Sequence, residues 1–70
     1  MEDFNGENIE IGDTIFFAHK IGQVIIGQIS EIKGKKTIIV KIEDIIKHSP
    51  KFMAYGYGIV VNSDRVIKLK

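Results

Sequence analysis

Isoleucine and valine dominate the apolar residues of this chain. Fifteen of its 70 residues are isoleucine and five are valine, whereas leucine occurs once, as Leu69. Side chains that branch at Cβ have a restricted first torsion angle, and they fit the surface of a pleated sheet better than a helix. The sequence therefore predicts an all-β fold and argues against a helical bundle.

The length of the chain limits how many domains it can form. Seventy residues build one small core, so we expect a single domain rather than a two-domain enzyme. The chain has no cysteine, so neither disulfides nor thiolate metal sites can stabilise it. Residues 1–8 are polar and are predicted to form a flexible lead-in, followed by one domain over residues 9–70.

Apolar residues alternate with polar ones in several short stretches that end in turn residues. This pattern predicts five strands. Gly27 lies within the second stretch and indicates a bulge or bend where that strand passes from one sheet to another. The strands are expected over residues 14–19, 24–32, 37–42, 55–61 and 66–69.

Two connections stand out from the rest. Residues 43–54 contain Pro50, which cannot donate a hydrogen bond to a sheet, so they are predicted to form one long loop, with or without a helical turn. Residues 62–64 predict one turn of 3₁₀ helix before the last strand. Five short strands around one core favour a small closed or half-open barrel, because closure removes exposed sheet edges.

The alternation also assigns residues to the inside of this barrel. More apolar residues remain than the inside can hold, and we expect something else to cover Ile26, Ile39, Ile45, Ile46 and one of Val60 and Val61. The predicted core consists of Ile15, Ile25, Ile29, Ile38, Val40, Ile42, Ile67 and one of Ile59 and Val60.

The start of the chain and its apolar runs suggest a location. Met1 is followed by Glu2 and Asp3, whereas a signal peptide begins with basic residues before an apolar stretch. The longest apolar runs are far too short to span a bilayer. We therefore expect a cytoplasmic protein with no membrane partner.

Charge is distributed unevenly along the chain. Residues 1–13 hold five acids and no base, residues 14–42 hold five lysines against one acid, and residues 43–70 hold five bases against three acids. The net charge is +1, which by itself indicates no nucleic-acid partner, but the asymmetry indicates a polar binding surface.

Three segments resemble SH3-like barrels, particularly the KOW type. Ile11-Gly12-Asp13-Thr14-Ile15-Phe16-Phe17 resembles the start of the first strand, and Gly22 with Gly27-Gln28-Ile29 resembles the glycine-spaced turn and second strand. Asp64-Arg65-Val66-Ile67 resembles the closing strand after its 3₁₀ turn. The resemblance implies a small five-stranded SH3-like barrel. The size and the abundance of isoleucine, lysine and asparagine also resemble small accessory proteins of bacteriophages, many of which bind host proteins.

Residues that carry catalysis are scarce. His19 and His48 lie in different segments without the spacing of metal ligands, and the serines lack the context of a nucleophile. The glycines do not form a phosphate-binding loop. We therefore expect no enzyme, no metal and no cofactor.

Two kinds of binding partner remain open. A protein partner is the first hypothesis, because aromatic residues dominate protein interfaces, and it implies a regulatory or inhibitory role. The residues predicted to bind it are Phe52, Met53, Tyr55, Tyr57 and Phe16.

Nucleic acid is the alternative, since lysines attract a phosphate backbone. A homo-oligomer that pairs edge strands is a third hypothesis. The residues predicted to contact nucleic acid are Lys33, Lys35, Lys36, Lys41, Lys47, Lys51 and Arg65.

Overall fold

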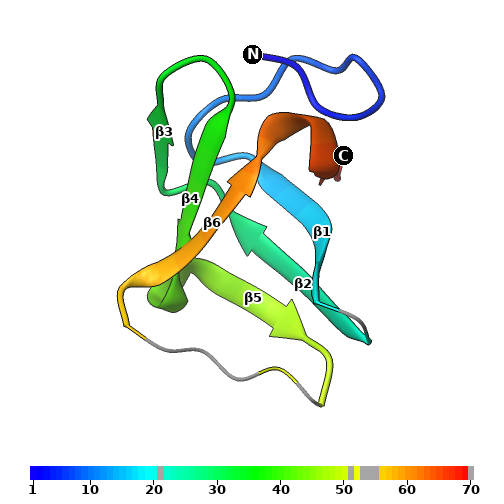
Figure 1. Ribbon diagram of the computed structural model, residues 1–70, viewed down its shortest axis with the longest axis vertical. Coiled ribbons are helices and arrows are strands. Elements are labelled where there is room, and N and C mark those ends of the chain that lie inside the picture. The colour runs from blue at the N-terminus through cyan, green and yellow to red at the C-terminus, as the bar shows by residue number, and fades with distance from the viewer. Residues whose placement is uncertain (21, 51, 53–55, 70) are drawn as a thin grey trace.

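The fold is all-β, as the composition predicts. The computed structural model describes residues 1–20, 22–50, 52 and 56–69, which form seven strands and two short 3₁₀ turns (Figure 1). The strands are β1 (Thr14–Lys20), β2 (Gln23–Gln28), β3 (Glu31–Lys33), β4 (Thr37–Lys41), β5 (Ile45–His48), β6 (Gly58–Asn62) and β7 (Ile67–Lys68). The 3₁₀ turns are η1 (Ile42–Asp44) and η2 (Ser63–Arg65).

The strands form two antiparallel sheets. One has the order β5-β2-β1-β7 and the other the order β3-β4-β6. The described strands do not join the two sheets into a closed barrel, because β5, β7, β3 and β6 each pair on one side. Seven strands stand where we predicted five, since the second predicted strand is divided and β5 was not predicted.

Gly27 allows the second predicted strand to bend. A Cβ atom there would lie 2.8 Å from Val40 Cγ1 and 3.1 Å from the carbonyl oxygen of Asp44, so no larger side chain fits without movement. The pairing of β2 with β5 shifts register between Ile26 and Gly27. The chain then leaves one sheet at Gln28 and enters the other at Glu31. The predicted bulge and change of sheet are confirmed.

The loop predicted over residues 43–54 is wrong in its first half. η1 turns the chain at residues 42–44, and β5 then pairs with β2, with His48 opposite Ile25 and Lys47 opposite Ile26. Ile45 packs against the core, and this burial favours a strand where the sequence shows no clear alternation. The predicted 3₁₀ turn before the last strand is confirmed as η2.

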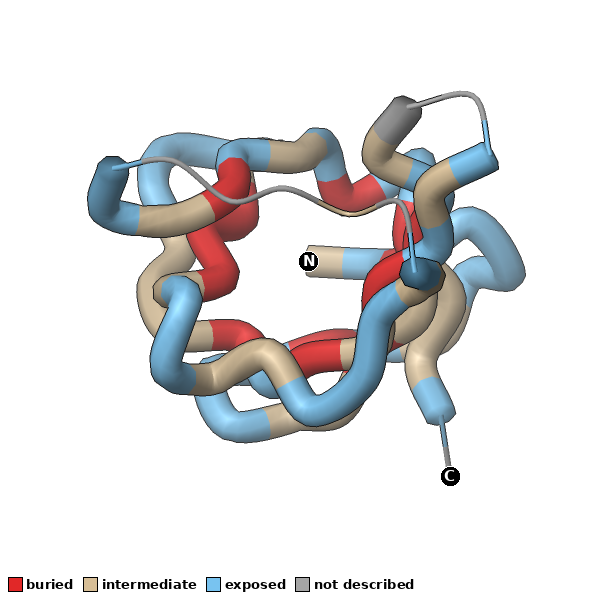
Figure 2. The backbone as a smooth tube through the Cα atoms, turned by 90° about the horizontal axis from the view of Figure 1, so that it is seen from below, coloured by how far each residue is buried: buried red, intermediate tan, exposed pale blue. Residues whose placement is uncertain are grey.

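The core lies between the two sheets. Seen from below, the backbone circles the core, and the strands carry most of the buried residues, while Ile9, Ile29 and Val66 come from the connecting segments (Figure 2). Of the predicted core, Ile42 and Ile67 are wrong: Ile42 lies in η1 and is 38% exposed, and Ile67 is half-buried outside the core cluster. Ile39, which we expected to remain outside the core, is buried at 7% exposure. The core cluster consists of Ile9, Ile15, Phe17, Ile25, Ile29, Ile38, Val40, Ile59 and Val66.

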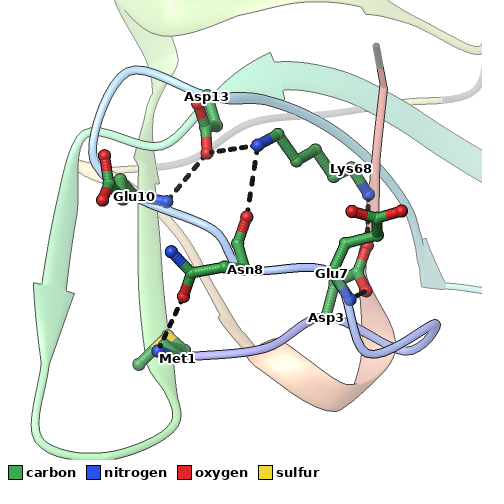
Figure 3. A network of polar contacts seen from close by, with 7 residues as sticks. All are labelled: Met1, Asp3, Glu7, Asn8, Glu10, Asp13 and Lys68. Atoms are coloured by element: carbon green, nitrogen blue, oxygen red, sulfur yellow. Dashed lines mark hydrogen bonds and ion pairs between the residues drawn. The ribbon is translucent and has the colours of Figure 1, made fainter.

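The carboxylate of Asp3 joins the two ends of the chain. Its Oδ1 accepts hydrogen bonds from the backbone N–H groups of Asn5 (2.9 Å) and Glu7 (2.8 Å). Its Oδ2 accepts one from the N–H of Lys68 in β7, at 2.7 Å (Figure 3). The hydrogen bond from Lys68, followed by those from Glu7 and Asn5, lowers the pKa of Asp3 below 3.8, although desolvation raises it.

The side chain of Lys68 extends this network. Its Nζ lies 3.4 Å from Asp13 Oδ2 and donates a hydrogen bond to the carbonyl oxygen of Asn8 at 3.2 Å (Figure 3). Phe4 N–H donates to the carbonyl oxygen of Val66 at 2.9 Å. The domain boundary that we predicted at residue 8 therefore does not coincide with a break in contacts, and the flexibility of residues 1–8 stays a prediction.

No helix in the described part of the chain is long and apolar enough to cross a membrane.

Candidate binding surface

A row of mainly apolar side chains crosses the outer face of the four-stranded sheet. Ile15 and Phe17 of β1 are buried, so Phe16 between them points outward. Phe16 pairs with Ile67 on one side and with Ile26 on the other, and Ile26 pairs with Lys47. We call Ile67, Phe16, Ile26 and Lys47 the outer row.

A shallow hollow adjoins the outer row between β2 and β5. Its volume is about 320 Å³, and it is lined by Val24, Ile26, Lys47, His48, Ser49 and Pro50. We call it the β2–β5 groove. Val24, Ile26 and Pro50 make its walls largely apolar, while Lys47 and His48 are its ionisable residues.

Backbone hydrogen bonds hold the end of the groove in place. Ser49 N–H donates to the carbonyl oxygen of Val24 at 2.9 Å, and Val24 N–H donates to Ser49 Oγ at 3.3 Å. These bonds continue the pairing of β2 with β5 beyond His48 and keep Pro50 beside β2. The groove is therefore part of the sheet framework and not of a separate loop.

Phe52 lies close to the groove but is half-buried. Its ring centroid is 4.9 Å from that of His48 and 6.5 Å from that of His19, and its side chain packs against the core cluster. Phe52 N–H donates to the carbonyl oxygen of Ser49 at 3.0 Å. Phe52 thus supports His48 from the core side, and its contact with a partner stays a prediction.

Tyr57 lies on a different surface from the groove. It is 63% exposed, its ring centroid is 5.2 Å from Lys41 Nζ, and its hydroxyl donates to Glu31 Oε2 at 3.4 Å. Lys41 and Glu31 belong to the three-stranded sheet. The hydrogen bond with Tyr57 raises the pKa of Lys41. Of the other predicted partner-binding residues, Phe16 belongs to the outer row, and Met53 and Tyr55 lie outside the described residues.

The predicted nucleic-acid residues are also divided between surfaces. Lys33, Lys35 and Lys36 are exposed around the β3–β4 turn, at the opposite end of the molecule from β5 with Lys47 (Figure 1). Lys41 lies beside Tyr57, and Arg65 belongs to η2. Lys51 lies outside the described residues.

A further polar contact was not apparent in the sequence. Ser30 Oγ donates to Asp44 Oδ2 at 2.5 Å and accepts a hydrogen bond from Lys41 N–H at 2.8 Å. It joins the bend between β2 and β3 to η1. The groove, like this contact, joins residues that are distant in the sequence. Val24 and Pro50 come together only when β5 pairs with β2. The one indication of the groove in the sequence was Ile26, which was predicted to be an apolar residue in excess of what the core can hold.

The described residues thus define a small all-β domain with a half-buried apolar row beside a groove, and they contain no cluster of side chains suited to holding a metal ion. The chain belongs to the family described as a domain of unknown function, DUF7205, which matches residues 1–69. No curated protein and no solved structure matches the chain.

Proposed function

We propose that this protein is a non-catalytic binding module that uses the β2–β5 groove to bind another protein. The observation that carries the proposal is the apolar outer row beside a largely apolar groove. The outer face of a sheet that only contacts solvent normally carries polar side chains. Aromatic and branched apolar residues beside a groove are typical of protein interfaces.

The charges around the groove favour a particular partner. Lys47 and His48 line it, and among the described residues no acidic side chain does. Val24, at 37% exposure, and Ile26 supply apolar contact beside these basic groups. The chemistry suits an apolar side chain of the partner that lies next to an aspartate or glutamate.

The arrangement of strands is consistent with a small SH3-like barrel. The β2 and β3 segments form a bent strand that pairs with β4 and β5, and η2 leads into a closing strand that pairs with β1. These are the features that the resemblance implies. The resemblance to bacteriophage accessory proteins extends the proposal to a cytoplasmic regulator or inhibitor of a host protein.

A comparison of variants by affinity capture tests the groove. Immobilised wild-type protein, Val24→Glu and Lys47→Glu would be exposed to lysate of the source or host cell, with Lys35→Glu as a control of equal charge change on the distant β3–β4 turn. We expect a protein that wild type and Lys35→Glu retain and that both groove variants lose. Circular dichroism would verify that each variant is folded.

The affinity for the purified partner gives the decisive measurement. A glutamate in the groove should weaken binding by about tenfold or more, which corresponds to about 1.4 kcal/mol. Equal affinity of wild type, Val24→Glu and Lys47→Glu would refute the groove as the binding site.

Nucleic-acid binding is a second candidate, favoured by the three exposed lysines around the β3–β4 turn. Fluorescence anisotropy with single-stranded RNA and DNA should then show binding that weakens as salt increases. The double variant Lys35→Glu, Lys36→Glu should reduce it. Absence of binding at about 50 mM salt, where such electrostatic binding is strong, would exclude this candidate.

A further inference from the structure

The β6 strand forms an unprotected edge of the three-stranded sheet. It pairs with β4 and with no other described strand. A hollow of about 160 Å³, lined in part by Ala18 and His19 of β1 and by Val60 and Val61 of β6, separates β6 from the end of β1. Among the described strands, none of the neighbouring sheet pairs with this edge of β6.

The four edge strands differ in their charge. Exposed edges usually carry charged residues or proline, which prevent pairing with other chains. β3 carries Glu31 and Lys33, β5 carries Lys47, and β7 carries Lys68. β6 has the sequence Gly-Ile-Val-Val-Asn and contains neither a charge nor a proline. Val60 at its centre is 64% exposed.

We propose that β6 pairs with β6 of a second copy of this chain, antiparallel and about a two-fold axis at Val60. Val60 then faces Val60 of the second copy, and Ile59 faces its Val61. In the three-stranded sheet, Val60 pairs with Ile39, and Ile39 pairs with Glu31. The three-stranded sheets of the two copies then become one six-stranded sheet. Across it runs a row formed by Ile39 and Val60 of each copy, and Glu31 lies at each end of this row.

Symmetry explains why the occupant is a second copy. In a two-fold interface, each residue near the axis meets the same residue or a close neighbour, so an edge strand with charges of one sign repels itself. This repulsion affects β5 and β7, whose charged residues are basic, and β3 carries charges of both signs but has only three residues. β6 has five residues and brings only apolar and amide side chains together. The inference does not depend on the β2–β5 groove, which lies on the other sheet.

The interface is small, so the dimer should be weak. The whole chain exposes 4708 Å², and β6 has five residues. Stable protein interfaces bury about 1,200–2,000 Å² in total, and a single pair of short strands buries much less. We therefore expect monomers at micromolar concentration and dimers at millimolar concentration.

Sedimentation equilibrium across this concentration range tests the inference with two matched variants. Val60→Lys puts a charge on the proposed axis, and Ile46→Lys makes the same change at a site of similar exposure, 60%, on the β5 edge. We expect wild type and Ile46→Lys to dimerise equally. Two lysines that face each other should weaken the dimer of Val60→Lys by about tenfold or more.

Three results would overturn the inference. They are a wild-type protein that stays monomeric up to millimolar concentration, a Val60→Lys variant that dimerises like wild type, and a dimer that is lost in Ile46→Lys but not in Val60→Lys. Circular dichroism establishes that both variants are folded. Slower amide hydrogen exchange in β6 of wild type at high concentration, compared with low concentration, would support pairing of this strand.

Discussion

The joined chain ends and the outer face of β2 and β5 use their side chains in opposite ways. At the chain ends, Asp3 accepts three backbone hydrogen bonds, and Lys68 contacts both Asp13 and Asn8 (Figure 3). On the outer face, Val24 and Lys47 are exposed and line a groove. The first region directs its polar groups toward the protein, whereas the second directs apolar groups toward solvent.

This difference separates stability from binding. A carboxylate that satisfies backbone N–H groups near both ends of the chain stabilises the fold, because each N–H that loses its partner in the interior costs free energy. An apolar side chain on an outer sheet face contributes less to folding and is available to a partner. Substitutions in the two regions should therefore have different consequences.

The largest effect is expected for Ile9→Ala, in the segment that the chain-end network holds. Ile9 is fully buried, and truncation of a buried isoleucine costs about 2–5 kcal/mol. Because small domains have a free energy of unfolding of only about 5–15 kcal/mol, the variant should unfold at much lower urea concentration than wild type.

Ile26→Ala on the outer row provides the matched comparison. Ile26 is half-buried, so we expect a loss well below that of Ile9→Ala. Urea denaturation followed by circular dichroism measures both. Equal losses for the two variants would contradict the proposed division between the regions.

The second effect is a dependence of stability on pH that Asp3 causes. Its folded-state pKa is lowered, chiefly by the hydrogen bond from Lys68 N–H. A carboxylate with a lowered pKa stabilises the fold above its unfolded-state pKa of about 3.9, and this contribution is lost as the pH falls through the folded-state value. The Tm of wild type should therefore decrease on acidification below about pH 4.

Asp3→Asn should remove this part of the acid sensitivity and lower the Tm at neutral pH. Asp64→Asn is the control, since Asp64 is exposed and no hydrogen bond of its carboxylate occurs among the described residues. Melting curves across the acidic range compare the three proteins. If Asp3→Asn and wild type show the same acid dependence, the carboxylate does not hold the chain ends in solution.

The smallest effect on stability is expected for Lys47→Glu in the β2–β5 groove. Lys47 is exposed, and substitutions at such sites usually change the free energy of unfolding by no more than about 0.5 kcal/mol. The same variant should lose the protein partner. A large destabilisation would show that Lys47 has a structural role and would remove it as a probe of binding.

Much of the fold could be predicted from local pattern. The alternation around Ile15 and Phe17 identified an inner face of β1, and Gly27 identified the bend between the sheets. β5 was missed because its four residues follow Glu43 and Asp44 and precede Pro50, so they show no clear alternation. Ile45 acquires its strand conformation from pairing with β2 and from packing on the core.

The candidate surface was predictable only in part. Phe16 was predicted to bind a partner, and Ile26 was predicted to lie outside the core and to need a cover. The grouping of these residues with Lys47, His48 and Pro50 could not be predicted, because β2 and β5 are about twenty residues apart in the chain and adjacent in the sheet. Tyr57 was grouped with Phe52 by proximity in sequence, but it lies beside Lys41 on the other sheet.

The sequence by itself determined the sheet-forming character of this protein and the places where its strands turn. Branched side chains and glycines act through local sterics, which do not depend on the rest of the fold. Only the tertiary structure decided which apolar residues remain exposed and which charges lie beside them. Pairing between strands distant in sequence made Asp3 a link between the chain ends, Ile26 a wall of the groove, and β6 an uncharged edge.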